Sequence, residues 1–223
     1  NDKPKIVYGT MNDQQGNSYK TVKIGTQTWM AENLRTTIYN DGTPIPHILN
    51  DDEWYAQWDN INSSWEGAYC TYNNTTNAEE IKLYGCLYNW YAINTGKLCP
   101  SGWHIPTDED WMILCNYLIA NGYGYGGSGD YIGKSLASTS GWCSVTDPAS
   151  IGNKQIKNNS TGFTAVPAGR RLHGGDFVWL GEYAEWWSHS DDDIIWFLGC
   201  GGGDLSSVQT LRKEGHSVRL VKN

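Results

Sequence analysis

Residues 181–221 read GEYAEWWSHSDDDIIWFLGCGGGDLSSVQTLRKEGHSVRLV, and the two ends of this segment differ in character from its middle. Trp186 and Trp187 supply large apolar surface near the front, and residues 217–221 alternate as a strand with one buried face does. The middle, residues 189–211, mixes acidic residues, glycines and serines without a sustained period. Loops that rigid elements hold at a surface often carry function. We therefore expect scaffold at both ends, with one of the two tryptophans facing inward, and an irregular displayed surface between them.

The composition favours a half-buried fold that is rich in strands or loops. The 223 residues include 12 Trp and 14 Tyr but only 3 Phe, together with 26 Gly. Aromatic rings with a polar edge suit half-buried strands, and glycines suit turns and close backbone approaches. No linker-like run or shift in composition marks a boundary, so we expect residues 1–223 to form a single domain.

Charge and hydropathy argue against two classes of partner. A net charge of −8 does not suit a phosphate-binding surface, so nucleic acid is not an expected partner. No apolar run approaches the length of a membrane span, and the first ten residues are not a signal peptide. We expect a soluble chain, with any lipid anchor lying outside the given sequence.

The clearest local motif is a helix start at Thr107. Threonine suits the N-cap, and the three acidic residues that follow suit the first helical turn, where the helix dipole favours negative charge. Trp111, Leu114 and Leu118 then recur at helical spacing, and Gly122 is a typical stop. The sequence predicts a helix between Thr107 and Gly122.

Motifs for catalysis are weak. The five histidines form no catalytic motif, and Cys200 has no basic neighbour in sequence to activate it as a nucleophile. Asp191, Asp192, Asp193 and Asp204 offer oxygen ligands suited to calcium, without the ligand spacing of a calcium loop. A solvated acidic loop and a calcium site both stay open.

The cysteines leave two interpretations open. Six are present and none has zinc-site spacing, so either disulfides or buried free thiols are compatible with Cys70, Cys86, Cys99, Cys115, Cys143 and Cys200. What remains in residues 179–216 is a mixture of aromatic, acidic and small residues that suits adaptable binding loops. Trp179, Trp187 and Trp196 are of the kind that stacks on sugar rings or fills a partner's pocket, and they suit a place in the core equally well.

Several motifs, in this order, resemble the Fibrobacter succinogenes major paralogous domain family: TVKIGTQTWMAENL at 21–34, YGCLYNW at 84–90, CPSGWHIPT at 99–107, the segment from GF to GR at 162–170, and GHSVR at 215–219. The resemblance implies an α+β, C-type lectin-like fold with small antiparallel sheets, few helices and much irregular loop. That fold is distantly similar to the formylglycine-generating enzymes, whose tryptophan motif is echoed by GEYAEW at 181–186. The cysteine pair of those enzymes has no counterpart here, so an oxidase is not expected.

The resemblance also carries functional expectations. Members look like exported or surface-attached bacterial proteins, and some lectin-fold relatives are variable proteins of diversity-generating retroelements, in which template adenines are mutagenised. By that analogy residues 179–216 form a variable ligand-binding region, with Trp196, Arg212 and residues 217–219 as fixed scaffold. The candidate ligand-binding residues combine two tryptophans with residue types reachable from an AAY codon, and they are Trp179, Trp187, His189, Asp191, Asp193, Ile195, Phe197, Gly199, Cys200, Gly201, Gly203, Asp204 and His216.

These observations lead to one hypothesis and two alternatives. The hypothesis is a non-enzymatic, cofactor-free binding protein, at the cell surface or outside the cell, that takes a protein or glycan ligand of a cell or host surface and serves adhesion. The first alternative is a calcium-dependent glycan lectin that uses the acidic residues of the variable region. The second is an oxidase or hydrolase built on the same fold.

Overall fold

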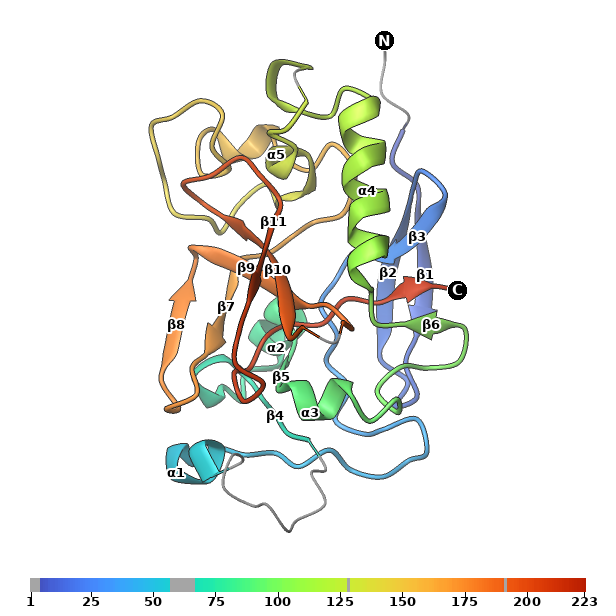
Figure 1. Ribbon diagram of the computed structural model, residues 1–223, viewed down its shortest axis with the longest axis vertical. Helices are drawn as coiled ribbons and strands as arrows, with labels where there is room; N and C mark the ends of the chain where they lie inside the picture. Colours follow the sequence, from blue (N-terminus) through green and yellow to red (C-terminus); the bar gives the residue numbers. More distant parts are fainter. Residues whose placement is uncertain (1–4, 57–66, 128, 191) are drawn as a thin grey trace.

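The computed structural model describes residues 5–56, 67–127, 129–190 and 192–223. Figure 1 shows an α+β chain in which small antiparallel sheets, short helices and long connections alternate. The helices are α1 (Asp51–Tyr55), α2 (Ala78–Tyr84), α3 (Trp90–Ile93), α4 (Asp108–Ala120) and α5 (Gly133–Leu136). The strands are β1 (Tyr8–Asn12), β2 (Ser18–Ile24), β3 (Gln27–Met30), β4 (Tyr69–Cys70), β5 (Leu87–Tyr88), β6 (Trp103–His104), β7 (Ala168–Arg171), β8 (Phe177–Leu180), β9 (Tyr183–Trp187), β10 (Ile194–Gly199), β11 (Ser206–Gln209) and β12 (Val221–Lys222).

The largest sheet joins the two ends of the chain. Its strand order is β1-β2-β3-β12-β6, so the C-terminal strand β12 lies between β3 and β6, as Figure 1 shows. Trp29 of β3 is opposite both Val22 and Val221, and its ring has no exposed surface. Because β12 pairs with β3 and β6, the residues just after the C-terminal region are held in the largest sheet.

Helix α4 forms where the sequence predicts it. The Thr107 Oγ1 atom accepts a hydrogen bond from the Asp110 amide (3.2 Å), and the Asp110 carboxylate accepts one from the Thr107 amide (3.0 Å), which together make a capping box. Trp111, Leu114 and Leu118 are fully buried on one side of the helix. The predicted spacing is confirmed because those positions are the ones that reach the core.

One face of a second sheet, with strand order β11-β10-β9, packs into the core. Trp186 of β9 is opposite Trp196 of β10, and both rings pack on Trp111 of α4, with ring centroids 5.7 and 5.9 Å apart. Asp108 accepts hydrogen bonds from the Trp196 indole and the Ser188 hydroxyl, both at 2.7 Å. The start of the helix is therefore attached to this sheet as well as packed against it.

Two expectations about this region were wrong. Residues 189–211 are not one irregular surface, because they contain β10 and β11, which pair with Ile195 opposite Val208. Trp186 and Trp187 are both fully buried, where the sequence suggested one exposed ring. Successive strand residues point to opposite faces, and here both faces of β9 are covered at these positions, one by the Trp111 cluster and the other by a cluster around Tyr88.

The cysteines divide between the two possible states. Cys143 and Cys200 form a disulfide that ties the end of β10 to the loop before residue 150. Cys70 and Cys86 are buried free thiols, and Cys99 and Cys115 are half-buried free thiols. Burial raises the pKa of Cys70 and of Cys86 to about 12, so these thiols are unreactive near neutral pH.

Candidate functional site

A cavity of about 940 Å³ lies on the face of the β9–β11 sheet that points away from the tryptophan core. Strand alternation produces it, because Trp186 and Trp196 point to the core while Glu185 and Phe197, which are paired across the strands, point to the cavity. Strands β7 and β8 lie beside this sheet (Figure 1). Arg170 of β7 and Trp179 of β8 line the cavity with the residues of the sheet. The lining residues are Tyr91, Arg170, Trp179, Tyr183, Glu185, Asp193, Phe197, Val208, Gln209, Thr210, Leu211, Arg212 and Glu214.

Three aromatic rings make the wall of the cavity. Trp179 and Tyr183 have ring centroids 4.8 Å apart, and Tyr183 and Phe197 have centroids 6.2 Å apart. Trp179 has a φ of +66°, a left-handed conformation that residues other than glycine adopt at a cost of about 1–3 kcal/mol. The backbone of the β8–β9 turn holds it there, and its carbonyl accepts a hydrogen bond from the Glu182 amide (3.0 Å). The turn thus aims a large ring, 39% exposed, at the cavity.

The floor of the cavity is a buried network of charges. The Arg170 Nη1 atom lies 3.2 Å from a Glu214 oxygen and 3.9 Å from a Glu185 oxygen, and its guanidinium stacks 4.2 Å above the Trp179 ring. His216 has no exposed surface, and its two ring nitrogens face the carboxylates of Glu185 (Nδ1, 3.2 Å) and Glu214 (Nε2, 3.5 Å). One strand residue from each of β7 and β9 therefore meets two residues of the segment after β11.

The network shifts the pKa values of two of its members. Burial alone would raise the pKa of Glu214, but hydrogen bonds from His216 and Thr210, with the positive charge of Arg170, lower it to about 2. Burial alone would lower the pKa of His216, but hydrogen bonds to Glu185 and Glu214 and their negative charges outweigh it, and the pKa is raised above 6.5. A carboxylate that stays ionised and a histidine held between two carboxylates suit a fixed polar floor.

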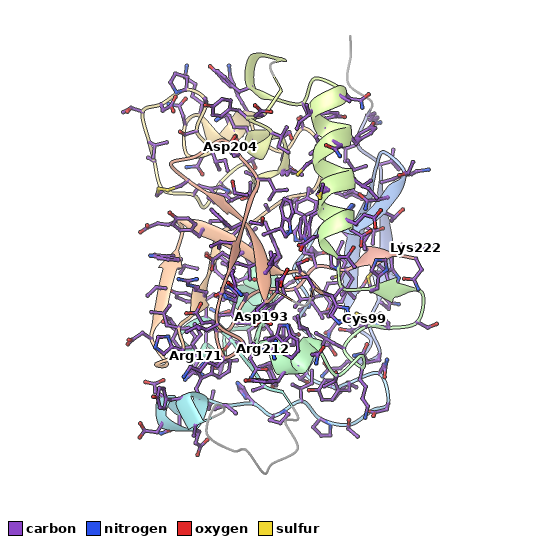
Figure 2. The ribbon with its side chains drawn as sticks, in the orientation of Figure 1. Cys99, Arg171, Asp193, Asp204, Arg212 and Lys222 are labelled. Atoms are coloured by element: carbon purple, nitrogen blue, oxygen red, sulfur yellow. A yellow bond between two sulfur atoms is a disulfide. The ribbon has the colours of Figure 1, made fainter. Side chains whose placement is uncertain are left out.

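A second ion pair stands at the mouth. The Arg212 Nε atom donates to both oxygens of Asp193, each at 2.8 Å, and the guanidinium of Arg212 lies 4.2 Å above the Trp90 ring. The Asp193 carbonyl accepts a hydrogen bond from the Thr210 amide (2.9 Å), which extends the β10–β11 pairing by one residue. Figure 2 shows Asp193 and Arg212 close together, with Asp204 far from them in the turn that joins β10 to β11.

The predicted ligand-binding residues differ in whether they line the cavity and in how far they are buried. Trp179, Asp193 and Phe197 line the cavity. Trp187, Ile195 and His216 have no exposed surface. These three residues therefore do not line the cavity, although His216 belongs to the network beneath the floor, and their role in ligand binding stays a prediction.

The remaining predicted positions lie elsewhere. Cys200 is buried in its disulfide, and Gly203 is buried with its carbonyl accepting from the Gly133 amide, and neither lines the cavity. The others, His189, Gly199, Gly201 and Asp204, are half-buried or exposed and do not line the cavity, and Asp191 lies outside the described residues.

Sequence reasoning missed Arg170, Glu185 and Glu214, which form the floor. They come from segments far apart in the chain and meet only in the fold. One signal was present, since Glu185 is the one charged residue in the apolar strand YAEWW, and a charge in a covered strand requires a partner.

Within the described ranges, no group of three or more His, Cys, Asp and Glu side chains is arranged to hold a metal ion. No helix among the described residues is long and apolar enough to cross a membrane.

The fold and the site define an α+β chain whose C-terminal sheet separates an aromatic core from an aromatic-walled cavity. The sequence profile of the Fibrobacter succinogenes major domain matches residues 22–222, so the chain belongs to that family. Neither a curated protein nor a solved structure gives a significant match. The match runs from β2 to β12 and includes every segment that lines the cavity.

Proposed function

We propose that this chain is a non-enzymatic binding protein, displayed at a cell surface, that takes a protein or glycan ligand into the cavity on the β9–β11 sheet. The cavity carries the proposal. Its volume of about 940 Å³ falls in the range of about 300–1,000 Å³ typical of ligand sites, and it combines apolar walls with a few fixed polar groups.

The chemistry of the floor favours recognition over catalysis. A general acid must hold a proton near neutral pH, whereas the lowered pKa of Glu214 keeps that side chain ionised. His216 engages both ring nitrogens with carboxylates and is fully buried, so it has no free nitrogen to offer a substrate. Cys200, the thiol considered as a nucleophile, is bonded to Cys143.

The disulfide supports display outside the cytoplasm. Disulfides persist mainly in oxidising compartments, and Cys143–Cys200 ties the end of β10 to the loop before residue 150. Brief protease treatment of intact cells, followed by immunoblotting, tests the location. Digestion of this protein while a cytoplasmic marker survives is the expected result, and full protection in intact cells argues against surface display.

Burial also limits where sequence diversification could act, if the chain is a variable protein. Substitution of an exposed residue at the cavity mouth or the surface costs little unfolding free energy, whereas substitution of a fully buried residue costs much more. We expect variation at His189, Asp193, Phe197 and Asp204, and constancy at Ile195, which is fully buried. Deep sequencing of this gene in a natural population checks the pattern, and equal variation at buried and exposed positions would contradict it.

The cavity itself is tested with two matched variants. Val208→Arg places a long charged side chain at the rim, where Val208 is 49% exposed, and Ile156→Arg makes the same change at a site 80% exposed that does not line the cavity. Labelled proteins are applied to a glycan array and to a displayed library of random peptides. We expect a ligand whose binding falls at least about tenfold with Val208→Arg and is unchanged with Ile156→Arg. Ligands insensitive to Val208→Arg would place binding elsewhere.

A further inference from the structure

Strand β11 is the edge of the three-stranded sheet, and its outer backbone groups can be assigned. The Thr210 amide bonds to the Asp193 carbonyl, so that pair is hydrogen-bonded, and in an antiparallel ladder such pairs alternate with non-bonded ones. Val208, opposite Ile195, therefore directs its amide and carbonyl toward β10.

Ser207 and Gln209 consequently direct their amides and carbonyls outward. The hydrogen bonds between β10 and β9 support this assignment. The Ser188 amide donates to the Ile194 carbonyl, so even-numbered residues of β10 bond to β9 and odd-numbered residues bond to β11. No backbone hydrogen bond within the described ranges uses the outward groups of Ser207 and Gln209.

The edge strand is short, at four residues, but it lacks the other usual protection against pairing with another strand. Natural edge strands are kept short or are blunted by lysine, proline, bulges or covering segments. Here Ser206, Ser207, Val208 and Gln209 are uncharged, include no proline and are largely exposed. An open, neutral edge of this kind accepts an additional strand.

Exposed apolar side chains stand on both sides of the cavity beside this edge. Val208 and Leu211 are 49% and 45% exposed on the β11 side, and Trp179 is 39% exposed on the β8 side. Exposed apolar groups that gather around a cavity are typical of protein-binding sites. A strand added to β11 would bring every second side chain to the cavity face.

The charges indicate which segment fits. The cavity lining holds two guanidiniums, Arg170 and Arg212, against three carboxylates, and His216 lies beneath two of those carboxylates. The chain as a whole carries −8. A second copy of this acidic chain is disfavoured by like charge, and a segment that combines apolar with basic side chains is favoured.

We propose that the ligand is an extended segment of a protein partner, apolar and basic in character, that pairs with the outer edge of β11 and inserts alternate side chains into the cavity. This inference rests on the proposed function and narrows its ligand from protein or glycan to an extended peptide.

The test uses the outward amide of Ser207. Ser207→Pro removes that donor and leaves the β10–β11 ladder intact, since proline is tolerated on an edge strand where its nitrogen faces solvent. Ser207→Ala changes the side chain and keeps the amide, so it is the matched control. Linear random peptides on phage are selected on the wild-type protein, and the best are synthesised for fluorescence polarisation.

We expect enriched peptides with alternating apolar residues and a basic neighbour. Ser207→Pro should weaken their binding at least about tenfold, because it leaves a buried peptide carbonyl without a donor, whereas Ser207→Ala should not. N-methylation along the peptide should be harmful at every second residue, since a β-ladder uses alternate amides. Thermal unfolding that is unchanged in Ser207→Pro assigns the loss to the contact.

Several results would overturn the inference. One is failure of the selection to enrich any peptide, and another is equal affinity of the peptides for wild type and Ser207→Pro. The third is a dimer of this chain in sedimentation that Ser207→Pro dissociates, which would make the occupant a second copy. A glycan whose binding is lost with Val208→Arg and kept with Ser207→Pro would refute the peptide ligand and leave the proposed function standing. If no peptide or glycan responds to Val208→Arg, both fall.

Discussion

Replacing Arg170 by methionine tests whether the cavity floor is a coupled charge network. The side chain of Arg170 is 16% exposed, and those of its partners Glu214 and Glu185 are 8% and 3% exposed. Removing one partner of a buried ion pair costs about 3–5 kcal/mol, because the remaining charge stays buried without compensation. His216 still faces both carboxylates and Arg170 is partly hydrated, so we expect the lower end, about 3 kcal/mol of unfolding free energy.

Urea unfolding at neutral pH, followed by tryptophan fluorescence, measures this loss without the salt screening that guanidinium adds. Glu214→Gln in the Arg170→Met background should restore more than about 1 kcal/mol, because it removes one uncompensated carboxylate. Arg212→Met is the matched control, since its side chain is 42% exposed, and we expect it to cost about 1 kcal/mol or less. A loss below about 1 kcal/mol for Arg170→Met, or strictly additive effects in the double variant, would refute the coupled floor.

Three further predictions use the same unfolding assay or calorimetry. Replacing Cys143 and Cys200 by alanine should lower the unfolding free energy by about 4 kcal/mol, the loop-closure value for a sequence separation of 57 residues. The charge network of the floor should contribute most to the unfolding free energy between about pH 4.5 and 6.5. The contribution of Glu214, whose pKa is lowered to about 2, is lost as the pH falls below 4.5. The contribution of His216, whose pKa is raised, is lost as the pH rises above 6.5. Titration calorimetry with calcium chloride should give no saturable heat, because both Asp193 oxygens already accept from an arginine.

Each has a contrary outcome. A loss for the double cysteine variant no larger than that of Cys115→Ser, which removes a free thiol, would contradict the loop-closure account. For pH, Glu214→Gln should flatten the acid side of the profile, and an unchanged profile would assign that side to other groups. Saturable calcium uptake that Asp193→Asn abolishes would favour the calcium-dependent lectin.

Local signals in the sequence were sufficient for helix α4. Its cap, acidic first turn and helical spacing all act within residues 107–122, so no distant contact was needed to predict it. The family resemblance is likewise confirmed, since its motifs are short runs that the profile match covers. The small antiparallel sheets expected of an α+β chain are present as well.

Strand β10 was missed for a physical reason. Alternation between polar and apolar residues indicates a strand with one solvent-exposed face. Ile194–Gly199 is instead a continuous apolar run, because Trp196 and Leu198 enter the core while Ile195 is buried on the other face. The floor of the cavity escaped prediction because ion pairs between residues far apart leave no periodic mark. Trp187 and Ile195 are fully buried away from the cavity, which residue type alone did not indicate.

The opposed faces of β10 also set which changes in length the chain can accept. Inserting or deleting one residue between Ile194 and Gly199 would exchange the sides of Trp196 and Phe197, sending the core ring to the cavity and the cavity ring to the core. In the turn at residues 200–205 the same event leaves both faces in phase. Homologous chains should therefore have no insertions or deletions within β10 and should confine them to the turn. The positions of gaps in a sequence alignment would then show which strand separates the core from the cavity.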